Sequence, residues 1–286
     1  MDLEFVVIGE GDTTLIIETG IGNSFYSWLD IAEELKSDFT IVLYHRAGYG
    51  KSKVSNEPRH VRAIAEELDL LVRQLDIQKP FVLAGHSFGG LCVQQYTRMF
   101  PEKVKGLVLI DSTSPDYYRI YDLDLPVMWS YISEEKMIQS NIQSSKKSSI
   151  ELETEMEAAI HDAEKTLPKH AFNDYKTFIT SPDLFHTIAR EFQNWPRDSE
   201  IINASGDFPA IPLTVIARDQ AVSAQPFIDH GIPQTEAHLH EKVWRELQEE
   251  LAMLNKTAGL VIAEGSDHEI HKDRPDIIIE ILLKYI

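Results

Sequence analysis

Gly85-His86-Ser87-Phe88-Gly89-Gly90 is the stretch that decides the fold, because it joins the apolar run Phe81–Ala84 to a helix-like run that begins at Leu91. A Gly-x-Ser-x-Gly pattern between a strand and a helix predicts a nucleophile elbow, a strained turn that lifts the serine hydroxyl out of the sheet. Both glycines are needed because a side chain at either position would collide with the neighbouring strand or helix. Taken alone, the pattern also fits a flexible Gly/Ser loop, so the rest of the chain decides between the two.

The rest of the chain alternates apolar strands with amphipathic helices. Strands are expected at residues 3–8, 14–18, 40–44, 81–84, 104–110, 213–217 and 259–263. The residues between the first two, Gly9-Glu10-Gly11-Asp12, are typical of a hairpin turn. The later strands are apolar enough to be covered on both faces, which indicates an α/β fold with a mostly parallel sheet flanked by helices.

The alternation stops after the strand that ends at Asp111. Residues 112–208 contain helical patterns only, including a capping box formed by Ser148 and Glu151. We therefore expect a catalytic domain built from residues 1–111 and 209–286, with residues 112–208 inserted as a helical lid, or cap.

Composition limits the function classes. The 27 basic and 46 acidic residues give a formal net charge of -19, so neither nucleic acid nor an anionic membrane surface is an expected partner. Cys92 is the only cysteine, which excludes an internal disulfide and predicts a buried apolar role. The N-terminus lacks a basic region ahead of an apolar run, and no stretch is of membrane-spanning length, so we expect a cytoplasmic protein. The oligomeric state stays open.

A serine hydroxyl is a poor nucleophile until a base takes its proton, so a histidine is required. His86 is adjacent to Ser87 and points away on a tight turn, which predicts a structural role. His268 follows the last apolar strand, in a loop at the same sheet edge as the elbow, and is preferred over His271 as the base. Asp267, His268 and His271 are too closely spaced, without a further ligand, to indicate a metal site. Neither a metal nor a cofactor is expected.

The acid that orients the histidine is expected at another strand end, in the order serine, acid, histidine. Asp219 follows the strand at 213–217 directly and is our choice, with Asp111 as the alternative. Asp207 lies before a strand, at the opposite edge, and is the weakest candidate. For the oxyanion hole we expect the backbone amides of Phe88, which starts the elbow helix, and Ile21, in the glycine-rich loop after the second strand.

With these residues placed, the chain resembles the α/β-hydrolase superfamily over nearly its whole length. Residues 85–90 match the family's elbow, and Tyr44–Ser52 is similar to its strand-end segment, which usually has aspartate where this chain has His45. His268–Pro275 resembles the family's histidine segment, with the histidine seven residues before the proline, and this alignment selects His268. Thr19–Gly22 resembles the oxyanion loop. One departure is that Asp219 lies further from His268 than is common, because residues 221–240 are inserted.

The pattern in Trp244–Ala252 makes the chain similar to lidded carboxylesterase-like members described as methyl-ester hydrolases. The resemblance implies a serine hydrolase that acts on a small or medium uncharged ester. A serine at position 87 argues against epoxide hydrolases and haloalkane dehalogenases, which use aspartate there. The alternatives are a lactonase, a carbon–carbon bond hydrolase, a cofactor-free perhydrolase, or a ligand-sensing member without turnover. Five aromatic residues are candidates for the pocket wall or for ordinary core: Phe25, Trp28, Trp129, Phe185 and Trp195.

Overall fold

The computed structural model describes residues 2–286, which form a seven-stranded sheet in the order β1-β3-β2-β4-β5-β6-β7. The strands are β1 (Phe5–Ile8), β2 (Thr13–Glu18), β3 (Phe39–Tyr44), β4 (Phe81–His86), β5 (Val104–Ile110), β6 (Leu213–Arg218) and β7 (Ala258–Ala263). Only β1 is antiparallel to its neighbour, among the strands of these residues. The carboxyl ends of β2 to β7 therefore meet at one edge, which confirms the predicted mostly parallel α/β sheet.

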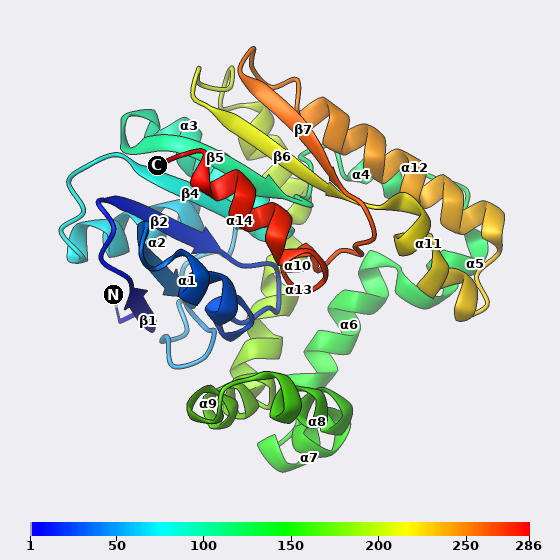
Figure 1. The fold of residues 1–286 in the computed structure, drawn as a ribbon. Helices are drawn as coiled ribbons and strands as arrows, with labels where there is room; N and C mark the ends of the chain where they lie inside the picture. The colour runs from blue at the N-terminus through cyan, green and yellow to red at the C-terminus, as the bar shows by residue number, and fades with distance from the viewer. Residues whose placement is uncertain (1) are drawn as a thin grey trace.

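Helices cover both faces of the sheet (Figure 1). Those outside the insert are η1 (Phe25–Trp28), α1 (Leu29–Leu35), α2 (Val61–Gln74), α3 (Phe88–Met99), η2 (Pro101–Lys103), α11 (Gln220–Asp229), α12 (Gln234–Leu251), α13 (Ile270–Asp273) and α14 (Pro275–Leu283). None of the helices formed by residues 2–286 is long and apolar enough to cross a membrane.

The period of two along each strand decides which face each side chain joins. In β2, Leu15 and Ile17 are buried in a core with α1 and α14, whereas Ile16 is buried in a second core with α2, α3 and the end of α12. Because Leu15, Ile16 and Ile17 are all buried, the apolar run of this strand is continuous rather than alternating. Burial on both faces is what a parallel sheet flanked by helices requires.

The expected hairpin between the first two strands is wrong. β3 lies between β1 and β2, pairing antiparallel with β1 and parallel with β2. Gly9 and Gly11 instead let the connection pass against the loop before β3: a Cβ on Gly11 would lie 2.1 Å from the carbonyl oxygen of Asp38. The glycines that signalled a turn are therefore needed for a close backbone approach.

The segment between β5 and β6 is helical, and it comprises α4 (Tyr118–Tyr121), α5 (Pro126–Ile132), α6 (Glu134–Ser144), α7 (Ser149–Glu155), α8 (Glu157–Thr166), α9 (Lys169–Ile179) and α10 (Pro182–Asn203). Ser148 caps α7 and Glu151 returns the bond, as the predicted capping box requires. In Figure 1, α7, α8 and α9 lie away from the sheet, whereas α10 runs back to it. We call residues 112–208 the helical insert.

Gly89 provides a test of the packing at the elbow. A Cβ there would lie 2.4 Å from the carbonyl oxygen of Glu18 and 2.6 Å from that of Thr19, both backbone atoms. We expect Gly89→Ala to destabilise the fold by about 1–3 kcal/mol or more, since the strand and helix must separate. The measurement is urea unfolding followed by circular dichroism.

The matched control is Gly259→Ala in β7, where an added Cβ would have no neighbour within 4 Å among the described residues. This change should be neutral or slightly stabilising. Equal stabilities for the two variants would contradict the packing argument.

Candidate active site

Ser87 occupies the strained position of the elbow. Its backbone has φ 53° and ψ −124°, outside the conformations that a non-glycine residue ordinarily adopts. A Cβ on Gly85 would lie 2.4 Å from Cγ2 of Val93, so the turn is possible only with glycine there. The Ser87 amide donates to the carbonyl oxygen of Ile110 at 3.1 Å, which ties the turn to the end of β5. Packing of β4, β5 and α3 thus maintains the strain.

His268 meets Ser87 across the sheet edge. Its Nε2 lies 3.0 Å from Ser87 Oγ, and its loop follows β7. His86 does not contact the serine hydroxyl; its Nε2 donates to the carbonyl oxygen of His268 at 3.0 Å. Burial, with the adjacent His268, lowers the pKa of His86 to about 3, so this ring is neutral and acts as a donor. His271 is buried elsewhere, stacked on Trp28 with ring centroids 4.4 Å apart.

Asp111, and not Asp219, lies against His268. The distance from His268 Nδ1 to Asp111 Oδ2 is 2.5 Å, so the structure brings together Ser87, His268 and Asp111 in one hydrogen-bonded series. Asp111 directly follows β5 and has φ 40°. Its amide donates to the carbonyl oxygen of Ile216 at 2.7 Å, and this bond to β6 fixes the turn that aims the carboxylate at the histidine.

The preference for Asp219 as the acid is therefore corrected. Asp219 begins α11 as its N-cap, and its carboxylate accepts from the amides of Ala221 at 2.9 Å and Gly265 at 3.0 Å. The hydrogen bond from Gly265, followed by others from α11, lowers the pKa of Asp219, although burial opposes it. Its carboxylate caps α11 and connects the loop after β6 to the loop after β7. This role explains why an aspartate follows β6 without contacting His268.

A buried arginine holds the charge of Asp111. Arg218, the last residue of β6, donates from Nη1 to Asp111 Oδ2 at 3.1 Å, and Trp244 Nε1 donates to Oδ1 at 2.9 Å. Burial alone would raise the pKa of Asp111, but Arg218, His268 and Trp244 together hold it well below its ordinary value. Glu241 accepts from the other two guanidinium nitrogens, Nε at 2.9 Å and Nη2 at 2.7 Å, so the arginine is itself paired with a carboxylate.

Sequence reasoning missed Arg218, Glu241 and Trp244. A basic residue directly at the end of an apolar strand was the available signal, since a charge at that position requires a buried partner. Glu241 and Trp244 lie three residues apart on α12 and thus share one helix face, which the local pattern gave no reason to point at β5. Trp244 bonds Asp111, more than a hundred positions earlier in the chain, and Glu241 bonds Arg218.

The glycine-rich loop after β2 passes directly beside Ser87. A Cβ on Gly20 would lie 3.2 Å from the Cβ of Ser87 and 3.1 Å from Nδ1 of His86, so glycine permits this approach. The next residue, Ile21, lines the cavity that contains Ser87 and His268. The elbow helix α3 begins at Phe88, on the other side of the serine. The loop and the helix start therefore flank Ser87.

The Ser87 cavity has a volume of about 440 Å³ and mixes apolar walls with a few polar groups. Its aromatic and aliphatic lining includes Ile21, Tyr117, Ile120, Tyr121, Met137, Phe192, Trp195, Phe227 and Trp244. Of the five aromatic candidates from the sequence, only Trp195 is in this wall, whereas Phe25 and Trp28 are core residues under α1. The insert and the α11–α12 region supply most of the lining.

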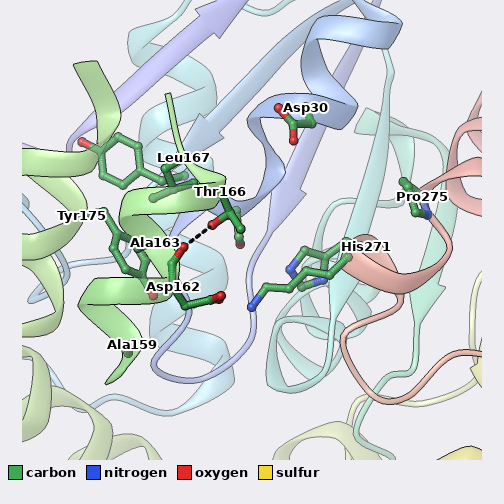
Figure 2. A pocket seen from close by; sticks show the side chains of 12 residues that line it. Asp30, Ala159, Asp162, Ala163, Thr166, Leu167, Tyr175, His271 and Pro275 are labelled. Carbon is green, nitrogen blue, oxygen red and sulfur yellow. Dashed lines mark hydrogen bonds between the residues drawn. The ribbon is translucent and has the colours of Figure 1, made fainter. Parts of the chain in front are cut away.

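A second cavity, of about 380 Å³, lies between the helical insert and residues of η1, α1, α13 and α14 (Figure 2). Ala159, Asp162, Thr166 and Tyr175 come from α8 and α9 on one side, and Asp30, His271 and Pro275 form the other. Ser87 and His268 are not among its lining residues. Residues 2–286 contain no cluster of three or more His, Cys, Asp or Glu side chains arranged to hold a metal ion.

Comparisons with known proteins show the family and the fold. Residues 13–202 match the family model described as alpha/beta hydrolase fold. An uncharacterized protein of Bacillus subtilis, YqjL, is 22% identical over 271 residues, covering 94% of this chain and 82% of its own. Two solved structures share the fold: a thermophilic esterase from Thermogutta terrifontis (TM-score 0.66, 18% identity, 99% and 92% of the chains) and an N-formylmaleamic acid deformylase from Pseudomonas putida (TM-score 0.61, 15% identity, 97% and 94%).

The roles of Asp111 and Asp219 can be distinguished by how fast Ser87 reacts with a fluorophosphonate. This reaction reports the nucleophilicity of the serine without assuming a substrate. We expect Asp111→Asn to slow labelling on the order of 10³–10⁴-fold, because His268 loses the group that fixes its tautomer. Asp219→Asn should label nearly as fast as wild type, since its carboxylate contacts backbone amides only.

Labelling is followed by mass spectrometry, with circular dichroism to check folding. A large loss in Asp219→Asn together with unchanged labelling in Asp111→Asn would overturn the correction.

Proposed function

The chain belongs to the α/β-hydrolase fold family, and on this premise we propose that it is a serine hydrolase that cleaves small or medium uncharged carboxylic esters. The observation that carries the proposal is the series Ser87–His268–Asp111, with distances of 3.0 Å and 2.5 Å, opening into a largely apolar cavity. This arrangement is the one that nucleophilic acyl transfer requires.

In the proposed reaction His268 Nε2 takes the proton of Ser87 Oγ, which attacks the ester carbonyl carbon. The amides of Ile21 and Phe88 donate to the oxyanion that forms. His268 then gives its proton to the leaving alcohol as the ester bond breaks, which leaves an acyl-serine. Water, activated by the same histidine, attacks the acyl-serine, releasing the carboxylic acid and restoring Ser87. Asp111 stays ionised throughout and stabilises the imidazolium.

The cavity supports the choice of an uncharged substrate. Its walls are mainly aromatic and aliphatic, and its arginine, Arg218, is already paired with Asp111 and Glu241. The carboxylate of Asp267, which also lines the cavity, accepts a hydrogen bond from the amide of His268. A substrate carboxylate would therefore lose its hydration shell without gaining an arginine or lysine that is free to pair with it. The volume is within the range of sites that enclose a small organic ligand, about 300–1,000 Å³.

The first test is hydrolysis of a chain-length series of p-nitrophenyl esters. We expect turnover with a short-to-medium optimum, and Ser87→Ala or His268→Ala should reduce kcat on the order of 10⁶-fold, as loss of nucleophile or base does in a comparable triad. His161→Ala is the histidine control, because this side chain is exposed on α8 and does not line the Ser87 cavity.

Undiminished turnover in Ser87→Ala would exclude the serine mechanism. A wild type that labels at Ser87 but hydrolyses no ester in the series would instead direct attention to lactones, carbon–carbon bonds, perhydrolysis or ligand sensing.

A pH profile tests the electrostatics of Asp111. Because its pKa lies well below the ordinary value, Asp111 remains ionised through the acid side of the profile, and log kcat/KM should fall with a limiting slope of one. For the same reason its contribution to stability is present above the ordinary carboxyl pKa and is lost only as the pH falls through the lowered one.

In the double variant Arg218→Met/Glu241→Gln, Asp111 loses the cation that counteracts the effect of its burial, so the pKa of Asp111 rises. The acid limb should move to higher pH and steepen, as measured by kcat/KM between pH 4 and 9. Arg119→Gln is the control, since Arg119 pairs with Glu246 and Glu250 on the same helix, α12, away from Asp111. A double variant with the wild-type profile would contradict the assignment.

A further inference from the structure

We propose that Glu191, on α10 of the helical insert, is a positioning residue that sets the loop Thr19–Asn23 beside Ser87 by holding Arg46 and Tyr49. We call this segment the oxyanion loop, because it carries the proposed donor Ile21. The inference rests on the proposed function, since a position for the loop matters to catalysis only if an oxyanion forms there.

Arg46 connects Glu191 to the loop backbone. Its Nη1 donates to the carbonyl oxygen of Thr19 at 2.6 Å and its Nη2 to that of Gly20 at 3.2 Å. Along the adjoining edge of the guanidinium, Nε and the same Nη2 donate to the two carboxylate oxygens of Glu191, at 3.0 Å and 3.2 Å. A guanidinium held in this bidentate way has one orientation, so the carboxylate decides where the loop carbonyls are anchored.

Tyr49 provides a second connection to the same carboxylate. The amide of Gly22 donates to the Tyr49 hydroxyl oxygen at 2.7 Å, and that hydroxyl donates to Glu191 at 2.6 Å. The direction of these bonds depends on Glu191, because a carboxylate can only accept and so takes the phenolic proton. The hydroxyl oxygen is then free to accept from Gly22, which has φ +71° and follows Ile21 directly.

The three side chains are enclosed together. Relative exposure is 0% for Glu191, 1% for Arg46 and 0% for Tyr49, so water does not replace a lost partner. Arg46 also pairs with Glu18 at the end of β2, and Glu191 also lies 3.5 Å from Arg59. In a buried network of this kind, removing one charge leaves the others uncompensated, and the groups they hold shift.

Attachment of the insert does not depend on Glu191 alone. On the same helix, Ile188, Phe192 and Trp195 join an apolar cluster with residues of α2 and α3. Arg190 donates to the carbonyl oxygens of Ser55 at 2.7 Å and Glu57 at 2.6 Å, which also links α10 to the part of the chain before β4. Arg190 is therefore a matched control: it shares the helix and the linking role but does not touch the oxyanion loop.

The experiment compares Glu191→Gln, Tyr49→Phe and Arg190→Gln by ester kinetics, inhibition by an alkyl boronic acid, and amide hydrogen exchange of residues 19–23. We expect Glu191→Gln and Tyr49→Phe to lower kcat on the order of 10–10²-fold with little change in KM, less than the 10²–10³-fold that loss of an oxyanion donor costs. Boronate affinity should fall in parallel, because the tetrahedral adduct needs the same donors. Amides of residues 19–23 should exchange faster in these variants, whereas Arg190→Gln behaves as wild type.

Different outcomes separate the inference from the proposed function. If wild type shows Ser87-dependent turnover and Glu191→Gln keeps its kcat, its boronate affinity and its exchange rates, the positioning role is wrong and the proposed function stands. Equal losses of kcat and boronate affinity in Glu191→Gln and Arg190→Gln would mean that Glu191 only attaches the insert, and the positioning role would be wrong. If wild type lacks Ser87-dependent turnover, the proposed function fails, and exchange of residues 19–23 alone decides whether Glu191 orders the loop. Tyr49→Phe keeps these comparisons possible if Glu191→Gln does not fold.

Discussion

The rest of the site depends on the hydrogen bonds that keep the buried carboxylate of Asp111 ionised. An isolated buried carboxylate would take up a proton, and a neutral acid cannot hold an imidazolium. Arg218 and Trp244 prevent this by donating to both carboxylate oxygens, and they come from β6 and α12. The strand order is therefore an electrostatic requirement as well as a packing result, since β5 and β6 must be neighbours for the pair to form.

Among residues 2–286, two buried ionic networks reach the segments around Ser87. Around Asp111, the network joins the ends of β5 and β6 to α12, and it reaches Nδ1 of His268. Around Arg46, it joins the end of β2 to the helical insert through Glu191, and it reaches the oxyanion loop. Ion pairs in low dielectric repay their desolvation only when the geometry is good, and breaking one costs about 3–5 kcal/mol. Both networks thus stabilise a single arrangement of the loops around the serine.

Local patterns predicted what depends on nearest neighbours in the chain. The elbow at Ser87 was recognisable because its turn has no room for side chains at Gly85 and Gly89, and this requirement shows in a stretch of a few residues. His268 was recognisable because it follows the last strand closely. The capping box at Ser148 was visible for the same reason. In contrast, the turn predicted at Gly9–Asp12 was wrong: a glycine pair signals close backbone approach and does not say which segment approaches.

By itself, the sequence determined the class of fold and singled out Ser87 and His268, which the structure brings within hydrogen-bonding distance. Periodicity, tight turns and strand ends are properties of short segments, so local patterns record them. Only the tertiary structure decided which aspartate lies beside His268, the order of the first three strands, and the partners Arg218, Trp244 and Glu191. Asp111 and Asp219 are both strand-end aspartates, and they differ in what is brought to them: Arg218 and His268 to Asp111, backbone amides to Asp219. Contacts between residues a hundred or more positions apart depend on how strands and helices pack, and no local pattern records that.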